Sequence, residues 1–335
     1  MYSVLRSLLF QMEPEAAHDF ALKQLNRFSG LNRAMIEPVQ KPVTLWDKTF
    51  QNPVGLAAGL DKNGAYIDGL AALGFGFIEI GTITPKPQEG NPKPRLFRLP
   101  EHQAIINRMG FNNQGVDALI RHVKASQYFR QKQGVLGINI GKNKVTPNEQ
   151  ANDDYLHCLR KVYPFADYVT VNLSSPNTPG LRELQFGEGL SDLLDVLKME
   201  QKQLTETYGR YVPLVLKIAP DLQPDELDQI IEKLQRFEMD GVIATNTSVD
   251  KSPVAGHAHA DEAGGLSGKV IREHAQQVIT PLSRALKGDI PIIAVGGISC
   301  AEDLALLREQ ADLVQIYTSF IYQGPKLIKD LAKAW

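Results

Sequence analysis

The sequence predicts an α/β protein built as a closed (β/α)8 (TIM) barrel with an N-terminal helical hairpin extension. Two patterns predict the barrel. Eight short runs rich in β-branched and other apolar residues alternate with segments of helical periodicity from residue 43 onward, which is typical of parallel βαβ units. Polar side chains gather where these runs end, as they do where the binding loops of a barrel follow its strands. A chain of 335 residues accommodates one such barrel with additions.

The first forty residues differ from the rest and predict a helical hairpin over residues 1–40, ahead of a barrel domain over residues 41–335. The first segment carries apolar residues at helical spacing, and Pro14 opens a second segment of the same kind. Neither apolar run reaches the roughly 20 residues that a transmembrane helix needs. The residues alone leave two interpretations open. The hairpin packs on the barrel, which is the commoner use of amphipathic helices, or it lies in a membrane interface.

Eight strands are expected along the barrel domain, each a short apolar run. They span residues 54–58, 77–82, 136–141, 168–174, 214–219, 241–247, 292–297 and 313–318. Helices are expected between them, for example over 223–237, which opens with Pro, Asp and Glu, and over 301–310 after Ser299. Residues 86–105 are too many for an ordinary βα loop and predict a lid or rim element. Residues 43–51 predict a hairpin that closes the bottom of the barrel.

The fourth predicted strand leads directly into a polar loop, within the stretch 168–180, YVTVNLSSPNTPG. Its first four residues are aromatic or β-branched, as expected of a strand in a covered parallel sheet. The loop then presents amide and hydroxyl side chains around Pro176 and Pro179, which restrict the backbone and so preorganise a site. An ordinary Ser/Asn/Pro turn is the alternative for this loop taken alone.

Polar or glycine residues follow every predicted strand, and the carboxyl ends of the strands of a barrel all meet on one face. The residues at these positions are Lys62, Thr82, Asn139, Asn172, Ser175, Lys217, Thr245, Asn246, Gly296, Gly297, Tyr317 and Thr318. Two lysines and several amides on one face predict a ligand site there.

Glycine-rich loops near the last two strands indicate that this ligand carries a phosphate group. Gly296 and Gly297 end the seventh strand, and the run 264–268, GGLSG, precedes another expected helix. Such loops, backed by helix N-termini, form the usual phosphate site of this fold, with tight turns alone as the alternative. Lys217 is expected to face the ring of a phosphorylated cofactor and to stabilise negative charge on it. A Schiff-base lysine and a structural ion pair are the competing interpretations.

Composition argues against two other classes of protein. The net charge is −2 and no basic run occurs, so a nucleic-acid partner is not expected. Cys158 and Cys300 lie far apart without metal-ligand spacing, and the pair His257 and His259 sits in a loop-like stretch with no ligand cluster beside it. No metal site is predicted.

Nine motifs spread over the chain carry a family resemblance. They are GLAAGLDKNG (55–64), IEIGTITPKPQEGNPKPRLFRLPE (78–101), NRMGFNN (107–113), VNLSSPNTPG (171–180), LKIAPD (216–221), ATNT (244–247), GGLSG (264–268), VGGI (295–298) and QIYTSF (315–320). Over essentially its whole length the sequence resembles the class 2, membrane-associated, quinone-dependent dihydroorotate dehydrogenases. Two features select this class: Ser175, where class 1 relatives carry cysteine, and the N-terminal hairpin.

The resemblance implies one non-covalently bound FMN per chain and assigns its neighbours by position. The implied FMN-binding residues are Ala57, Ala58, Gly59, Lys62, Thr82, Asn139, Asn172, Lys217, Thr245, Gly268, Gly297, Tyr317 and Thr318. The implied substrate-binding residues are Lys62, Asn107, Arg108, Met109, Gly110, Phe111, Asn172, Asn177, Asn246 and Thr247. Ser175 corresponds to the catalytic base of the family.

The resemblance also implies the reaction, which belongs to de novo pyrimidine (UMP) biosynthesis. Ser175 would take the C5 proton of (S)-dihydroorotate while hydride leaves C6 for the flavin, giving orotate, and a ubiquinone or menaquinone would reoxidise the flavin. A relay through water or Thr178 is our hypothesis for how the proton leaves the serine. Two alternatives remain: another FMN barrel that acts on a related ring with a soluble acceptor, and a non-catalytic sensor of a phosphate ligand.

The resemblance favours the membrane interpretation of the N-terminal hairpin and implies that the hairpin is a membrane-facing quinone entrance. The chain is then expected to be a peripheral membrane protein on the cytoplasmic side of the inner (cell) membrane. Arg98 and Tyr317 would lie between this entrance and the flavin, and His18 would line the same tunnel.

Overall fold

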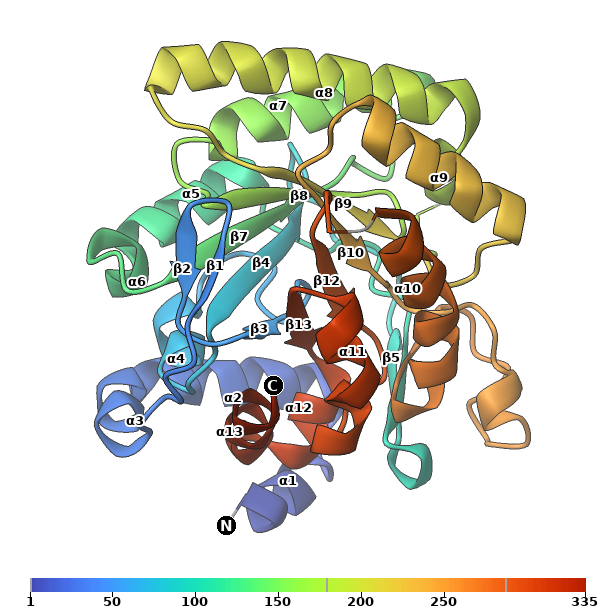
Figure 1. The fold of residues 1–335 in the computed structure, drawn as a ribbon. Helices are drawn as coiled ribbons and strands as arrows, with labels where there is room; N and C mark the ends of the chain where they lie inside the picture. Colours follow the sequence, from blue (N-terminus) through green and yellow to red (C-terminus); the bar gives the residue numbers. More distant parts are fainter. Residues whose placement is uncertain (1, 179, 287) are drawn as a thin grey trace.

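Eight parallel strands close into a barrel around which the rest of the chain is arranged (Figure 1). The structure is a computed structural model that describes residues 2–178, 180–286 and 288–335. Around the barrel the strands follow chain order, β3–β4–β7–β8–β9–β10–β12–β13, and β13 pairs with β3 to close it. Their bounds are β3 (Val54–Leu56), β4 (Phe77–Ile83), β7 (Val135–Ile140), β8 (Tyr168–Asn172), β9 (Leu214–Ile218), β10 (Gly241–Ala244), β12 (Ile292–Val295) and β13 (Leu313–Ile316). The predicted barrel is confirmed.

Most of the predicted strands continue past the point where the observed strands end. The difference is largest for β10, which ends at Ala244, whereas the predicted strand continues to Thr247. The residues beyond each strand leave the hydrogen-bonded ladder and form the loops of the pocket described below.

Helices cover the outside of the barrel, as βα alternation requires. They are α4 (Ile67–Ala71), α5 (Val116–Ala125), α6 (Gln127–Arg130), α7 (Ala151–Val162), α8 (Gly187–Tyr208), α9 (Pro224–Arg236), α10 (Arg272–Leu286), α11 (Leu304–Gln310), α12 (Thr318–Gln323) and α13 (Pro325–Ala334). Short 3₁₀ turns join them at Pro100–His102, Asn148–Gln150, Leu181–Gln185, Ser252–Val254, Lys269–Ile271 and Ala301–Asp303. The predicted starts of α9 and of the turn before α11 lie within a residue or two of the observed ones.

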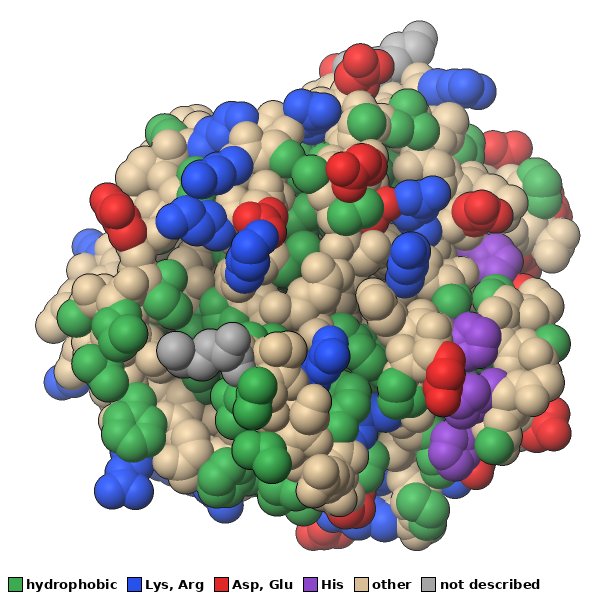
Figure 2. Space-filling model, turned by 90° about the horizontal axis from the view of Figure 1, so that it is seen from below, with side chains coloured by type: hydrophobic (Ala, Val, Ile, Leu, Met, Phe, Trp, Pro, Cys, Tyr) green, Lys and Arg blue, Asp and Glu red, His purple; other side chains and the backbone are tan. Residues whose placement is uncertain are grey.

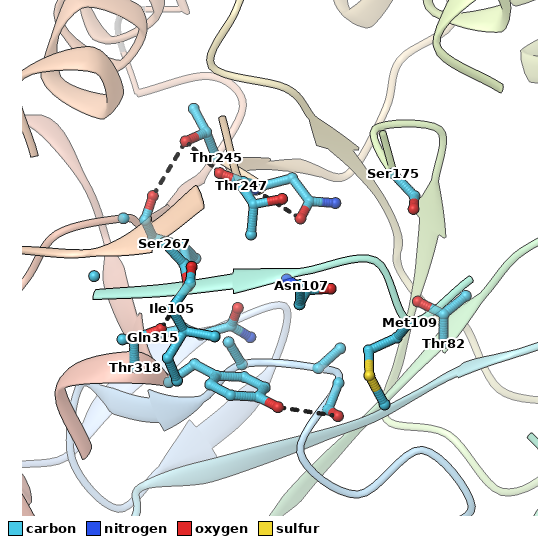
Figure 3. Close-up of a pocket in the computed structure, with 18 of the residues that line it drawn as sticks. Thr82, Ile105, Asn107, Met109, Ser175, Thr245, Thr247, Ser267, Gln315 and Thr318 are labelled. Carbon is cyan, nitrogen blue, oxygen red and sulfur yellow. Dashed lines mark hydrogen bonds between the residues drawn. The ribbon is translucent and has the colours of Figure 1, made fainter. Parts of the chain in front are cut away.

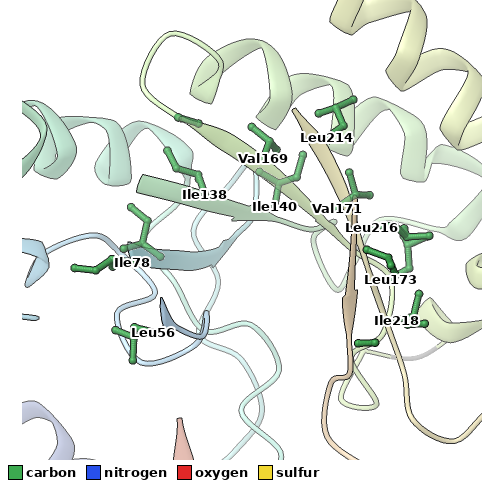
Figure 4. Packing of buried hydrophobic residues seen from close by; sticks show 14 of the residues in the cluster. Leu56, Ile78, Ile138, Ile140, Val169, Val171, Leu173, Leu214, Leu216 and Ile218 are labelled. Carbon is green, nitrogen blue, oxygen red and sulfur yellow. The ribbon is translucent and has the colours of Figure 1, made fainter. Parts of the chain in front are cut away.

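Alternate residues of each strand face two separate apolar cores. One set points outward against the helices and includes Leu56, Ile78, Val169 and Leu216 (Figure 4). The other set points into the barrel, where Phe77 and its neighbours from the other strands form a smaller cluster. Burial on both faces explains why these strands read as nearly continuous apolar runs.

A short hairpin closes the bottom of the barrel, as the sequence predicts. Its strands are β1 (Val43–Leu45) and β2 (Lys48–Phe50). Phe50 has no exposed surface and packs edge-on against Phe77, with ring centroids 5.1 Å apart. Trp46 Nε1 donates to the Asp240 carbonyl at 2.7 Å and so fixes the hairpin to the start of β10.

A three-stranded antiparallel sheet forms part of the rim at the opposite end. It comprises β5 (Leu96–Leu99), β6 (Ala104–Asn107) and β11 (Gly265–Gly268), in the order β11–β6–β5. The rim element expected over 86–105 is therefore present. The GGLSG run lies mostly in a strand of this sheet and reaches α10 through a 3₁₀ turn.

Three helices precede the barrel: α1 (Tyr2–Leu9), α2 (Pro14–Arg27) and α3 (Ser29–Met35). The predicted hairpin corresponds to α1 and α2, whereas α3 was not expected. Leu22 anchors α2 in the outer core, and burying one leucine contributes about 1.5–3 kcal/mol. By contrast, α1 and α3 bury none of their side chains. Among the described helices, none combines the length and apolar character that crossing a bilayer requires.

Candidate active site

One large pocket opens at the carboxyl ends of the barrel strands (Figure 3). Counted out to the open solvent at its mouth, the space inside it is about 1260 Å³. Its walls come from the strand ends, the rim sheet and the first turns of α2. A site at this face was the central functional prediction from the sequence.

Most of the predicted site residues line this one pocket. They are His18, Ala57, Ala58, Gly59, Lys62, Thr82, Asn107, Met109, Gly110, Phe111, Asn172, Ser175, Asn177, Lys217, Thr245, Asn246, Thr247, Gly268, Gly297, Tyr317 and Thr318. Residues from all three predicted groups, FMN, substrate and quinone tunnel, thus meet in one space.

Three predicted residues do not line the pocket. Asn139 lies behind Thr82 within the barrel. Arg108 points away from the cavity into an ion pair with Glu262, with Nη1 and Oε2 2.5 Å apart. Arg98 instead donates to the carbonyls of Leu9 and Met12 and so holds the turn between α1 and α2.

Ser175 lies on the loop after β8, buried and facing the cavity (Figure 3). Its Oγ accepts a hydrogen bond from the Asn177 backbone N–H at 3.3 Å. The loop is tied down at both ends: Arg182 Nε donates to the Ser174 carbonyl at 3.2 Å, and Asn148 Nδ2 donates to the Gly180 carbonyl at 2.9 Å. Pro179, part of the predicted preorganisation, lies outside the described residues.

Asparagine amides form the wall beside Ser175. Asn177 Nδ2 donates to Asn107 Oδ1 at 3.3 Å, and Asn246 Nδ2 donates to Ser174 Oγ at 2.9 Å. Asn172 Nδ2 donates to Thr82 Oγ1 at 2.9 Å. Because neighbouring groups hold these amides, the orientation of each amide is fixed.

Two lysines bring positive charge into the pocket, and neither forms an ion pair within the part of the chain that the structure describes. Burial lowers the pKa of Lys62 to about 8, although the nearby carboxylate of Glu15 opposes this shift. Burial also lowers the pKa of Lys217, and the carboxylate of Glu79 opposes it. A lysine that lacks a protein carboxylate partner is suited to meet negative charge on a ligand.

A glycine-lined recess lies where the phosphate site was predicted. Gly268 and Gly297 have φ of +107° and +75°. A Cβ on Gly268 would lie 2.3 Å from the Gln103 carbonyl oxygen, and one on Gly297 would lie 2.4 Å from Arg272 Cα. Only glycine fits at either position. Thr318, at the start of α12, shares a hydrogen bond of 2.8 Å with Ser267 on the same side.

The N-terminal side of the pocket was only partly predicted. His18 lines it, and burial together with the charge of Lys62 lowers the pKa of His18 to about 3, so this ring is neutral at physiological pH. Glu15, from the first turn of α2, also lines it and pairs with buried Arg95, whose Nε lies 3.0 Å from Oε1. In the sequence Glu15 is one of the acidic residues common at helix starts, and nothing local marks it as part of a site.

Groups of three or more His, Cys, Asp and Glu side chains placed to hold a metal ion do not occur among the described residues. His102, His257 and His259 do gather near one another on the surface, with neighbouring ring centroids 5.7 and 5.6 Å apart, and Figure 2 shows such a histidine cluster.

Comparison with known proteins gives a consistent result over the whole chain. The family model "Dihydroorotate dehydrogenase" matches residues 41–334. The "Dihydroorotate dehydrogenase (quinone)" of Pseudoalteromonas translucida is 55% identical, covering 98% of both chains, and that of Methylobacillus flagellatus is 56% identical, covering 99% of both. The crystal structure of DHODH from Eimeria tenella in complex with ferulenol superposes with a TM-score of 0.87 at 36% identity, covering 96% of this chain and 90% of that one. The chain therefore belongs to the flavin-dependent dihydroorotate dehydrogenase (quinone) family.

Proposed function

We propose that this enzyme oxidises (S)-dihydroorotate to orotate in the barrel pocket and passes the electrons to a quinone, as a step of pyrimidine biosynthesis. The observation that carries the proposal is that Ser175, the asparagine wall and the two lysines all line one cavity. This combination offers a base, a surface for a ring with imide edges, and charge for both a carboxylate and a reduced cofactor.

FMN fits the other half of the pocket. Gly268 and Gly297 line this half, and the backbone N–H groups of such glycine loops commonly bind phosphate oxygens. Gln315 Oε1 on the pocket floor is buried without a hydrogen-bond partner among the described residues, so it is available to an N–H group of a ring. The Lys217 ammonium would lie beside that ring. When bound, FMN supplies the acceptor for hydride from the substrate and the donor of electrons to the quinone.

The substrate half of the pocket is built for a small planar ring with a carboxylate. Amides of Asn107, Asn172, Asn177 and Asn246 provide both donors and acceptors for its imide edges. Lys62, half-buried and without a partner carboxylate in hydrogen-bond range among the described residues, would bind the substrate carboxylate.

Ser175 would accept the proton from C5 of the substrate. The Asn177 N–H that donates to its Oγ favours the oxyanion that forms as the serine gives up its own proton. Thr178 Oγ1 is buried three residues further on without a partner among the described residues, which supports a role in carrying that proton away.

The N-terminal helices would rest on the membrane and admit the quinone. Large apolar side chains that are exposed on this part of the chain are Val4, Leu5, Leu8, Met12, Phe20, Phe28, Leu31 and Met35. Figure 2 looks at this side and shows hydrophobic groups with lysine and arginine among them, a composition that suits an anionic lipid surface. His18, on α2, and Tyr317 both line the pocket, and a quinone entering beside α2 would reach the flavin past them. The proposal includes a peripheral position on the cytoplasmic side of the inner (cell) membrane.

Anaerobic mixing tests the whole proposal. Dihydroorotate should bleach the visible absorbance of the flavin, and a ubiquinone analogue should then restore it. Bleaching without recovery by quinone would indicate a soluble acceptor. A flavin that ignores dihydroorotate, or a protein without flavin, would contradict the proposal and favour a barrel that only senses a phosphate ligand.

A further inference from the structure

Beneath the pocket, the barrel interior carries a polar layer around Glu79, a carboxylate that the proposed chemistry does not use. Glu79 on β4 lies in this layer with no exposed surface, and it is not among the pocket-lining residues. The interior below it is apolar and closed by Phe50 and Phe77. A carboxylate withdrawn from water is costly unless hydrogen-bond donors surround it, so its retention here points to a role.

Three donors converge on the Glu79 carboxylate. Asn139 Nδ2 donates to Oε1 at 2.8 Å, while Tyr168 OH and Gln315 Nε2 donate to Oε2 at 2.9 and 2.8 Å. An ionised carboxylate only accepts hydrogen bonds, so the charged form of Glu79 satisfies all three donors. The direction of each of these hydrogen bonds is therefore fixed by the charge.

A chain of hydrogen bonds with one direction runs from Glu79 to the pocket. Because the Asn139 amide turns its NH2 group to Glu79, its carbonyl faces Thr82, whose hydroxyl donates to it at 2.6 Å. The same hydroxyl accepts from Asn172 Nδ2 at 2.9 Å. The carbonyl of Asn172 is thereby turned toward Asn246, whose Nδ2 lies 3.4 Å away. Two backbone N–H groups favour the same orientations at the far end of the chain, because Ser174 N–H donates to Asn172 Oδ1 at 3.2 Å and Thr247 N–H donates to Asn246 Oδ1 at 2.8 Å.

We propose that Glu79 is a positioning residue that acts through this chain, together with the two backbone N–H groups, to fix which end of the Asn172 and Asn246 amides faces the substrate. The two ends of an amide are nearly equal in shape, so its hydrogen-bond partners decide its orientation. A dihydroorotate ring presents N–H donors and C=O acceptors at set places, and a reversed amide would meet it with the wrong group. The inference rests on the proposed function, because it takes dihydroorotate or orotate as the ligand of these amides.

The substitution Glu79→Gln tests the proposal directly. A glutamine at this position can donate as well as accept, so the chain of hydrogen bonds can run in either direction. Titration of the purified holoenzyme with orotate, followed by the change in flavin absorbance, should show a dissociation constant raised by about tenfold or more. FMN content should be retained. The rate at which a quinone analogue reoxidises the reduced enzyme should fall by a smaller factor than the orotate affinity does, because on the flavin side Glu79 holds only the Gln315 amide.

A second pair of variants covers the case in which Glu79→Gln does not fold. Thr82→Val interrupts the chain in its middle and leaves the Glu79 charge and its three donors in place, so it should also weaken orotate binding. Thr82→Ser keeps the hydroxyl and should restore most of the affinity. Tyr168→Phe is the matched control, because it removes one donor from Glu79 but no link toward the pocket.

Three outcomes would overturn the inference: unchanged orotate affinity in Glu79→Gln, equal losses in Thr82→Val and Thr82→Ser, or equal losses in Tyr168→Phe and Glu79→Gln. A parallel loss of quinone reoxidation would show instead that the polar layer only supports the pocket floor. Failure of the proposed function is separate, because it would appear in the unaltered protein as an absence of any response to orotate.

Discussion

The pocket end of the barrel and the N-terminal helices are built on opposite plans. Around the pocket, polar side chains such as Asn172 and Thr82 are buried and bonded to one another. On α1 and α3 no side chain is buried, and large apolar residues such as Leu8, at 59% exposure, face outward. Chemistry at a ring requires donors held in place, whereas the proposed contact of these helices with lipid requires apolar area without fixed partners. Substitutions in the pocket should therefore affect mainly flavin reduction by dihydroorotate, and substitutions on the N-terminal helices mainly reoxidation by quinone. The exception is the place where the two regions are joined.

The largest effect is expected from Ser175→Ala, within the pocket. Removing a general base should slow flavin reduction by dihydroorotate by about 10²–10⁴-fold. Orotate affinity and reoxidation by quinone should change little, because the substrate wall and the α2 side of the pocket are untouched. Stopped-flow measurement of each half-reaction checks this, with Ser191→Ala on the exposed face of α8 as the control. Equal losses in binding and in rate would show that Ser175 contributes to affinity and not to proton transfer.

The junction between the two regions is the ion pair of Glu15 and Arg95. Glu15→Gln keeps the shape but leaves a buried guanidinium without its charge partner, which should cost about 3 kcal/mol of unfolding free energy. Chemical denaturation measures this cost. Glu232→Gln is the matched control, since its partners lie 3.4 and 3.9 Å away at the surface and such pairs contribute little. A cost as small as that of the control would mean that α2 is held by Leu22 and its apolar neighbours alone.

The same contrast explains what the sequence could and could not predict. The barrel was predictable because burial on both strand faces leaves a local pattern, and the site was predictable because residues at strand ends must converge. The rim sheet was not predictable as a sheet, since β6 and β11 pair across a long separation, with Asn107 opposite Gly265. Glu79 and Glu15 carry no local signal either, because in the sequence one is a polar residue within a strand and the other an acid at a helix start. Their roles depend on partners that only the folded chain brings near.

A pH titration of orotate affinity tests whether the charge of Lys62 contributes to binding in the pocket. The pKa of Lys62 is lowered to about 8, so the side chain is charged below that pH and becomes neutral as the pH rises through it. Orotate affinity should then be nearly constant between about pH 6 and pH 7.5, fall by up to about tenfold per pH unit above the pKa of Lys62 in the free enzyme, and level off above the higher pKa that Lys62 has in the orotate complex. Lys62→Met should bind weakly at every pH and lose this dependence. An unchanged pH profile in that variant would assign the titration to another group.

The smallest effect is expected on the surface of the N-terminal helices. Leu8→Ser removes one exposed apolar side chain and should weaken binding to anionic phospholipid vesicles by about threefold to tenfold, with flavin reduction by dihydroorotate unchanged. Leu306→Ser on α11, where the leucine is 47% exposed, is the matched control and should leave vesicle binding unchanged. Co-sedimentation with vesicles separates the two variants. If both bind vesicles as the parent does, the apolar side chains of α1 do not enter the lipid, and the quinone must reach the pocket without the help of this surface.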